Sequence, residues 1–251
     1  AMRDWFGSRG DLTFHAGYAS IRLVAILATL IGLHLLIRNF AGPQFAPVPV
    51  LVLAGMYGLG YHNYVYQPTS VLDLAFLTIG LVLIARGHHW PLIPLIVLAT
   101  LNRNTAIFIA GAYGAWHIPE LFTRQRQTAQ SWIAMAMMVA AWALTWTLVE
   151  RAYPGQGWLG GPAHYINYNL HSVQAWILSV LALFPVAVAV VYAWRRAPLR
   201  PKLLLLVAVP YIALHLVMAQ VHEVRYWLNL YVLAGPMLAI AYERFASAEA
   251  A

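Results

Sequence analysis

An arginine flanked by polar residues interrupts one of the most apolar stretches of the sequence. Residues 90–116 are largely apolar but contain Asn102-Arg103-Asn104-Thr105 near their centre. A guanidinium placed deep in a membrane costs at least about 2.5–3.5 kcal/mol, so Arg103 must face either a ligand or a buried carboxylate. Asn102 and Asn104 can add hydrogen bonds to the same site. A helix that begins just after Arg103 also presents free N–H groups, and together these donors suit a phosphate.

Asp73 is the carboxylate best placed to neutralise Arg103, because it lies at the start of a neighbouring apolar run, just after Pro68-Thr69-Ser70. An acidic side chain in the first turn of a helix is also stabilised by the helix dipole. Two interpretations therefore stay open. Either Asp73 pairs with Arg103, or Asp73 stabilises the first turn of its helix and Arg103 binds an anionic ligand. Both residues are candidates for a substrate site.

A second charged group lies between the last two apolar runs, in Gln220-Val221-His222-Glu223-Val224-Arg225-Tyr226-Trp227. Glu223 and Arg225 could hold a polar ligand, with Glu223 as a general base, or they could form an ion pair that ties two helices together. His222 and His62, in two different loops, are further candidates for substrate binding. The pair His222-Glu223 lacks the second histidine of a zinc-protease motif.

Asp11 and His15, near the start of the chain, are candidate acid–base groups if this segment folds over the bundle; a solvated tail is the alternative. The sequence has ten histidines, none paired at the spacing that places two ligands on one helix face, and it has no cysteine. The lack of cysteine excludes disulfides, thiolate nucleophiles and Cys-ligated metals. We therefore expect no metal and no other cofactor, although a divalent cation would be compatible with the site.

The composition is that of a membrane protein. Hydrophobic residues make up 62% of the 251 residues and charged residues 9%, and the mean hydropathy is +0.67. Soluble domains carry roughly 45–50% apolar and 25% charged residues, so a water-soluble domain, a disordered chain and a coiled coil are excluded. The net charge of +7 fits basic residues gathered in cytoplasmic loops better than a nucleic-acid-binding surface, and we expect no nucleic-acid partner.

Seven apolar runs are candidate membrane spans, since a crossing takes about 20 residues of helix. They cover residues 18–38, 46–61, 69–86, 130–150, 173–194, 202–220 and 226–243. The sequence thus predicts an all-α fold with a single transmembrane helical domain over 18–245. An extracytoplasmic N-terminal tail (1–17) precedes this domain, and a cytoplasmic tail (246–251) follows it.

Basic residues orient the predicted bundle. The strongest cytoplasmic signal is Arg195, Arg196, Arg200 and Lys202, and Arg38, Arg86 and Arg124 fall on the same side when the spans alternate. Residues 90–116 must then return to the side from which they start, and each half, of about 11 residues, reaches only about 16 Å as a helix. We expect a re-entrant helical hairpin with its tip at Asn102–Thr105. The alternative is one straight helix with Arg103 at its middle.

The motifs around Asp73 and Arg103 resemble those of a known family. The first motif reads Tyr66-Gln67-Pro68-Thr69-Ser70-Val71-Leu72-Asp73-Leu74-Ala75-Phe76. The second follows Arg86 and an apolar run and reads Ala99-Thr100-Leu101-Asn102-Arg103-Asn104-Thr105-Ala106. The third, Glu223-Val224-Arg225-Tyr226, precedes the last apolar run. These segments resemble bacterial integral membrane proteins related to the GT-C glycosyltransferases. A subset of that family has Leu-Asn-Arg-Glu-Thr at the tip of an interrupted helix and Glu-x-Arg-Tyr before its last span. The resemblance covers roughly 18–116 and 215–243.

The resemblance implies a multi-pass protein of the bacterial inner (cytoplasmic) membrane that handles a sugar linked to a polyprenyl phosphate on the extracytoplasmic face. Arg103, helped by Arg225, would hold the phosphate of this lipid, and Asp11 or Glu223 would act as the base. The chain departs from the family pattern at two points. Asn104 replaces the usual Glu, and the outer loop that carries the family's catalytic carboxylate is missing, as if the chain lacked its first span.

Three functions stay open from the sequence. The first is a GT-C-like protein that binds a polyprenyl-phosphate-linked sugar and, if a base is present, transfers the sugar. The second is a non-catalytic accessory subunit of a larger membrane complex, in line with the short chain and its few carboxylates. The third is a lipid or solute transporter built on a broken helix, against which the lack of inverted repeats counts.

Overall fold

The computed structural model of the protein describes residues 8–61, 68–121, 127–154, 161–219 and 223–249. These residues form α-helices and short 3-10 turns, without a strand, which confirms the predicted all-α class. Four of the described helical segments are long and apolar enough to cross a membrane: Ala16–Ile37, Ala129–Ala152, Val173–Ala193 and Leu199–Met218. Two shorter apolar helices cover Thr69–Ala85 and Leu92–Asn102. A membrane protein is therefore the class that fits the structure.

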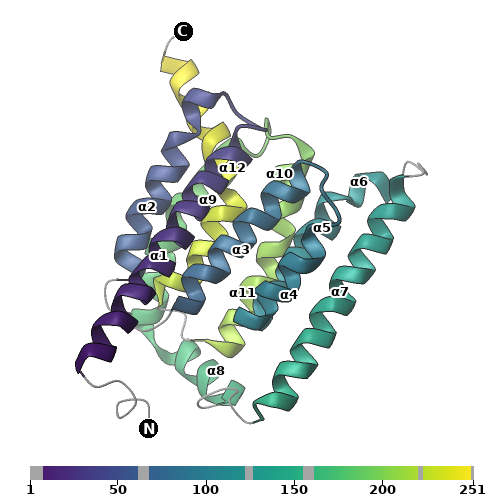
Figure 1. Ribbon diagram of the computed structural model, residues 1–251. Helices are drawn as coiled ribbons and strands as arrows, with labels where there is room; N and C mark the ends of the chain where they lie inside the picture. The colour runs from purple at the N-terminus through teal and green to yellow at the C-terminus, as the bar shows by residue number, and fades with distance from the viewer. Residues whose placement is uncertain (1–7, 62–67, 122–126, 155–160, 220–222, 250–251) are drawn as a thin grey trace.

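Each predicted apolar run contains a helix of the structure. The longer helices are α1 (Ser8–Ile37), α2 (Pro47–Tyr61), α3 (Pro68–Ala85), α7 (Gln127–Ala152), α9 (Val173–Ala193) and α12 (Val224–Glu249). The run over 202–220 is built from α10 (Leu199–Leu204), a 3-10 turn (Leu205–Val207) and α11 (Ala208–Met218). The short α6 (Ile118–Leu121) and α8 (Gly161–His171) lie at opposite ends of the bundle (Figure 1). Helix α1 begins at Ser8, well before residue 18, so much of the predicted tail is helical.

The core lies where α1, α3 and α12 run side by side in the same direction (Figure 1). Helices α2 and α9 pack against α12, and α7 packs against the interrupted segment at the edge of the molecule. Leu33 and Leu36 of α1 and Leu228 of α12 are fully buried. Large apolar side chains on the outward faces are exposed, such as Val24 of α1, Leu148 of α7 and Val191 of α9. An apolar outer surface of this extent is typical of a protein that contacts lipid.

The interrupted apolar stretch forms a helical hairpin of α4 (Leu92–Asn102) and α5 (Ile107–Trp116). Arg103 ends α4 with an extended backbone, at φ −158° and ψ 144°, and a 3-10 turn over Asn104–Ala106 leads into α5. The two helices run antiparallel, because His89, just before α4, lies beside Tyr113 near the end of α5 with His89 Nδ1 and Tyr113 Oη 2.7 Å apart. The hairpin therefore has its tip at Arg103 and its base at His89 and Tyr113.

Close helix contacts in the core make Gly32 sensitive to substitution. A Cβ atom added at Gly32 of α1 would lie 2.8 Å from Cγ2 of Thr78 in α3, whereas one added at Gly55 of α2 would meet nothing within 4 Å. We expect Gly32→Leu to push α1 away from α3 and to lower the free energy of unfolding by about 1–3 kcal/mol. Thermal unfolding in detergent measures the effect, with Gly55→Leu as the matched control. An equal change in both variants would contradict this packing.

Candidate functional site

Arg103 lies at the hairpin tip between the first turns of α3 and α12. Its side chain is half-buried, and its Nη1 donates a hydrogen bond to Oγ of Ser70 at 3.2 Å. Its Cζ lies 5.7 Å from the centre of the Tyr226 ring. Both partners are uncharged, so they position the guanidinium by a hydrogen bond and a cation–π contact without cancelling its charge.

Asp73, the expected partner of Arg103, is bound by other groups. Its Oδ1 accepts a hydrogen bond from Oγ1 of Thr105 at 2.8 Å, and its Oδ2 accepts one from Nδ2 of Asn229 at 3.0 Å. Asp73 acts on Arg103 electrostatically, but within the described parts of the chain no carboxylate oxygen lies within 4.0 Å of the Arg103 guanidinium. The guanidinium thus keeps donors for a further anionic partner.

A buried polar network extends from Asp73 into the bundle. Asn229 Nδ2 also donates to the hydroxyl of Tyr211 at 2.9 Å, and that hydroxyl donates to the carbonyl of Tyr226 at 2.8 Å. The ring of Tyr211 stacks on His215 with 4.1 Å between ring centres. Asn229, Tyr211 and His215 belong to none of the sequence motifs and were not predicted. The signal was present, because Asn229 and His215 are isolated polar residues within apolar runs.

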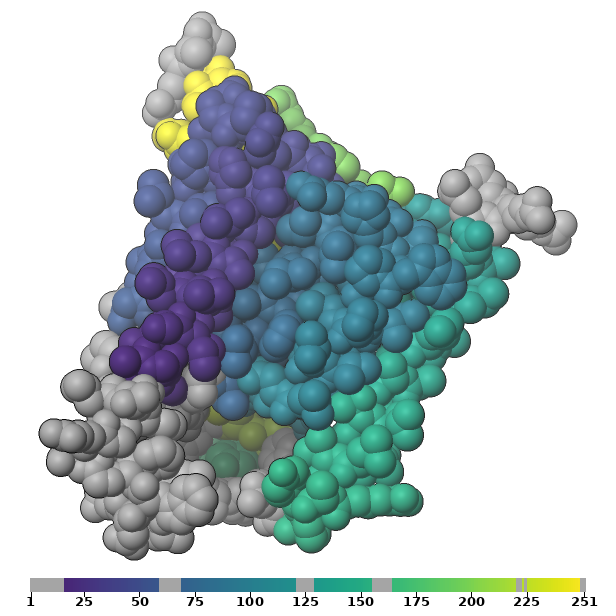
Figure 2. All heavy atoms as spheres, viewed as in Figure 1, coloured from purple at the N-terminus to yellow at the C-terminus, as the bar shows by residue number. Residues whose placement is uncertain are grey.

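Two hollow features lie at this end of the molecule. One is a small cavity lined by Asp73, Thr105, Tyr211 and Asn229 together with apolar side chains of α3, α5 and α12. The other is visible in Figure 2, where a hollow lies beside the lower part of α7 and below the hairpin, with deeper atoms of the chain seen inside it. The hairpin tip therefore faces a concave end of the bundle.

Glu223 and Arg225 form an ion pair at the start of α12. Arg225 Nε donates to Oε2 of Glu223 at 2.6 Å, Arg225 Nη2 contacts the same oxygen, and Nη2 also donates to the hydroxyl of Tyr226 at 3.1 Å. Arg225 is buried and Glu223 is half-buried. Tyr226 lies beside both Arg103 and Arg225, at 5.7 Å and 4.8 Å from ring centre to Cζ, so it joins the two cations at one site.

The two asparagines that flank Arg103 fix the hairpin tip to its neighbours. Asn102 Nδ2 donates to the carbonyl of Thr69 in α3 at 2.8 Å. The backbone carbonyl of Asn104 accepts a hydrogen bond from Trp142 Nε1 of α7 at 2.8 Å. The Asn104 side chain itself is exposed. Asn102 thus links the hairpin tip to α3, and its role in substrate binding stays a prediction.

Three predicted site residues fall outside what the structure describes. His62 and His222 lie outside the described residues altogether. Asp11 is in the first turns of α1, but its side chain is not among those described. The structure therefore brings together Arg103, Asp73, Glu223 and Arg225 through Ser70, Tyr226 and Asn229, and it leaves Asp11 as a prediction.

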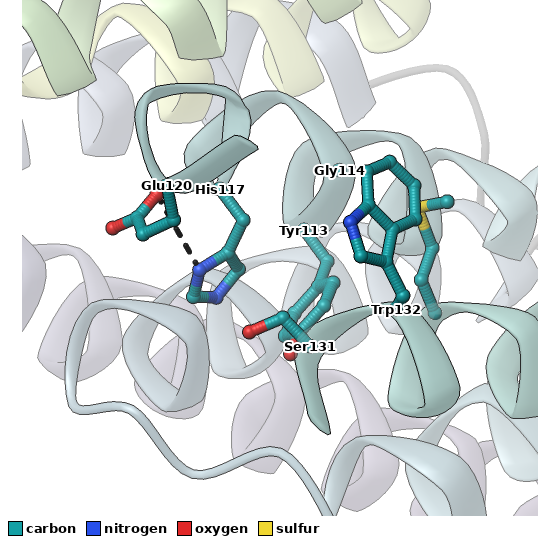
Figure 3. Close-up of a pocket in the computed structure, with 7 residues that line it drawn as sticks. Tyr113, Gly114, His117, Glu120, Ser131 and Trp132 are labelled. Carbon is teal, nitrogen blue, oxygen red and sulfur yellow. Dashed lines mark ion pairs between the residues drawn. The ribbon is translucent and has the colours of Figure 1, made fainter. Parts of the chain in front are cut away.

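A second polar cluster lies at the base of the hairpin, at the opposite end of the bundle. Glu120 of α6 pairs with Arg200 at 3.0 Å between Oε1 and Nη2, and Arg200 Cζ lies 5.0 Å from the centre of the Trp116 ring. His117 lies next to Tyr113, with 4.5 Å between ring centres, and its Nδ1 is 3.7 Å from Oε2 of Glu120. Figure 3 shows the imidazole between Glu120 and the pair Tyr113 and Ser131.

This cluster borders a small pocket lined by Tyr113, Gly114, His117, Glu120, Ser131, Trp132 and Met135. The pocket was not predicted from the sequence, because its residues come from α5, α6 and α7 and match no motif. Among the described residues, no three side chains of His, Asp or Glu come together as metal ligands.

Comparisons with known proteins give no relative. No protein-family model matches the chain, and searches of curated proteins and of solved structures find no significant match. The resemblance to GT-C proteins therefore rests on the short motifs around Asp73, Arg103 and Glu223.

The hydrogen bond from Thr105 to Asp73 gives the first prediction for the site. Thr105→Val keeps the shape of the side chain but removes the donor to a buried carboxylate oxygen. We expect the free energy of unfolding to fall by about 1–3 kcal/mol, measured by thermal unfolding. Thr147→Val is the matched control, because the exposed Thr147 hydroxyl only donates to the carbonyl of Ala143 in its own helix. A loss of stability in the control as large as in Thr105→Val would contradict the assigned role.

The second prediction concerns pH. Burial lowers the pKa of His117, which lies beyond the end of α5; Glu120 opposes this shift, and His89 and Arg200 add to it. The uncharged Tyr113 and Ser131 are its other neighbours in the pocket. The unfolded chain takes up the proton more readily than the folded one, so the free energy of unfolding should decrease as the pH falls below about 6.5. His117→Phe should weaken this dependence between pH 7.5 and 5.5 in thermal unfolding.

The control for the pH prediction is His171→Phe, since His171 is exposed at the end of α8. It should retain the pH dependence of the parent protein. If the stability of His117→Phe depends on pH as strongly as that of the parent protein, His117 is not the source of the pH dependence.

Proposed function

We propose that the protein is a GT-C-like integral membrane protein that binds a polyprenyl-phosphate-linked sugar, or a similar anionic lipid, at the end of the bundle where the hairpin tip lies. The bundle would comprise seven crossings and the re-entrant hairpin of α4 and α5. The N-terminus would be extracytoplasmic and the C-terminus cytoplasmic, in a bacterial inner membrane. Arg103 is the principal anion-binding residue of this proposal.

The observation that carries the proposal is the unpaired charge of Arg103 within the described residues. The oxygens of Asp73 are held by Thr105 and Asn229, and the polar and aromatic contacts of Arg103 within the described residues are to the neutral groups of Ser70 and Tyr226. A half-buried guanidinium at membrane depth is stable when an anion binds it. A lipid phosphate offers oxygens that suit bidentate binding by Arg, and the concave surface in Figure 2 offers space for it.

The distribution of basic residues supports the proposed orientation. Toward the hairpin base the described parts of the chain carry Arg38, Arg86, Arg195, Arg196, Arg200, Lys202 and Arg244, whereas the half toward the tip carries Arg9, Arg22, Arg103, Arg151 and Arg225. Basic residues favour the cytoplasmic side of a membrane. The base of the hairpin would then be cytoplasmic, and the lipid site would face the other compartment.

Sugar transfer is the second step of the proposal and needs a base. Glu223 is held by Arg225 through two nitrogen contacts, and both oxygens of Asp73 accept hydrogen bonds. Asp11 is the carboxylate that would have to activate the acceptor hydroxyl. The engagement of Asp73 and Glu223 favours a second candidate, a non-catalytic subunit that binds the lipid or packs beside partner proteins.

Native mass spectrometry of the protein, extracted gently from its own membrane, tests the proposal. We expect a retained polyprenyl-phosphate or sugar-phosphate lipid in the parent protein. Arg103→Ala should weaken its binding by about tenfold or more, since a charge-assisted hydrogen bond contributes about 1.5–3 kcal/mol. Arg151→Ala is the matched control, because Arg151 is an exposed arginine at the same end of the bundle.

Three outcomes separate the candidates. Loss of the lipid in Arg103→Ala alone supports the lipid site, and assays with Asp11→Asn then test transfer. Equal retention in both variants removes Arg103 from the site. Stoichiometric protein partners, with no anionic lipid in any variant, make the accessory subunit the better description.

A further inference from the structure

The pocket at the base of the hairpin has a chemical character unlike that of the Arg103 site. Arg103 offers hydrogen-bond donors and a positive charge, whereas this pocket presents acceptors beside aromatic rings. It lies between α5, α6 and the first turns of α7, at the end of the molecule that also holds Arg38, Arg86 and Arg195. It takes no part in the proposed binding at the hairpin tip.

The first acceptor in the pocket is the imidazole of His117. Both ring nitrogens of His117 are buried, and neither has a hydrogen-bond partner among the residues that the structure describes. Glu120 Oε2, at 3.7 Å from Nδ1, is too far away for a hydrogen bond. Burial lowers the pKa of His117, so near neutral pH the ring is uncharged and one nitrogen carries a free lone pair.

The other groups complete a set that suits a cation. The carboxylate of Glu120 supplies a negative charge, and the buried hydroxyl of Ser131 can accept a hydrogen bond. Tyr113 and Trp132 contribute aromatic rings to the same pocket (Figure 3). Aromatic faces attract cations, and a carboxylate with two neutral acceptors matches the three N–H donors of a primary ammonium group.

We propose that this pocket binds the primary ammonium of an amine-bearing phospholipid headgroup, of the phosphatidylethanolamine type. The ammonium donates to Glu120, His117 and Ser131, with the ring of Tyr113 beside it and Trp132 further along the same pocket. The lipid phosphate lies on the solvent side, next to Arg200.

The position of the pocket argues for a membrane lipid as the source of the ammonium. Trp132 is 42% exposed at the start of α7, and tryptophan is enriched where membrane and water meet. Met135, one turn further along α7, is an apolar neighbour for the lipid chain. The lining of the pocket thus changes from polar to apolar along α7. A phospholipid changes in the same way from its polar headgroup to its apolar acyl chains.

Arg200 provides the complementary charge. Its side chain is 48% exposed, and its Nη2 lies 3.0 Å from Oε1 of Glu120. The pair places a negative and a positive group side by side, in the arrangement that a zwitterionic headgroup requires. Phosphatidylcholine has the same charges but no N–H donors, and phosphatidylglycerol has no ammonium, so both should bind less well.

The test measures thermal stabilisation of the purified protein in detergent by added phosphatidylethanolamine, phosphatidylcholine or phosphatidylglycerol of the same acyl chains. Native mass spectrometry counts the bound lipids. We expect saturable binding of one phosphatidylethanolamine, at least about tenfold tighter than either other lipid, because the N–H donors pair with a charged and buried acceptor set. Equal stabilisation by the three lipids would overturn the proposal.

Two variants locate the site. Glu120→Gln removes the negative charge of the pocket, but it also weakens the contact with Arg200. His117→Phe is therefore the second variant, because it removes the imidazole and keeps a ring beside Tyr113. Each should lower the affinity for phosphatidylethanolamine by about tenfold. Glu150→Gln is the matched control, since Glu150 is an exposed glutamate at the other end of α7 and bonds only to Trp146 among the described side chains.

A further comparison decides whether the ligand is a membrane lipid or a soluble compound with the same headgroup. Soluble glycerophosphoethanolamine carries the same headgroup without acyl chains, and it should bind much more weakly than the lipid. Equal binding by this soluble compound would overturn the assignment to a membrane lipid. Unchanged affinity in both Glu120→Gln and His117→Phe would place the lipid elsewhere.

Discussion

The structure depends on how the polar residues of the hairpin tip are satisfied inside an apolar bundle. An unpaired polar group or charge in such surroundings costs several kcal/mol, and the tip contributes Asn102, Arg103 and Thr105 at once. The carboxylate of Asp73 is the central acceptor, because it binds Thr105 of the hairpin and Asn229 of α12 and attracts Arg103 electrostatically. These contacts hold α3, the hairpin and α12 together at one end.

The same arrangement explains why the site can be both rigid and open. Neutral partners take up the oxygens of Asp73 and the amide of Asn102, which fixes the backbone around the tip. The guanidinium of Arg103 is held by a hydroxyl and an aromatic ring, which orient it without neutralising it. A positioned charge with no direct counter-ion in the part of the chain that the structure describes is the arrangement expected of a binding group.

The sequence predicted the helical class, the places of the apolar helices and the break at Arg103, because each depends on local composition and periodicity. It also indicated that Asp73 and Arg103 belong to one site. It did not show that Thr105 and Asn229 bind the carboxylate, since Asn229 meets Asp73 only through packing of distant helices. The cluster of His117, Glu120 and Arg200 was missed for the same reason. Its parts are common surface residues, and only the fold places them around a pocket.

The contact between Asp73 and Asn229 also bears on the order in which the protein is assembled. These residues are 156 positions apart, and a chain is made from its N-terminus. Helix α3 and the hairpin are therefore synthesised long before the helix that supplies the amide for Asp73. Until α12 arrives, a carboxylate meant for the interior lacks one of its two donors. The contact that fixes Asp73 is thus completed only when α12 has been made and has packed against α3.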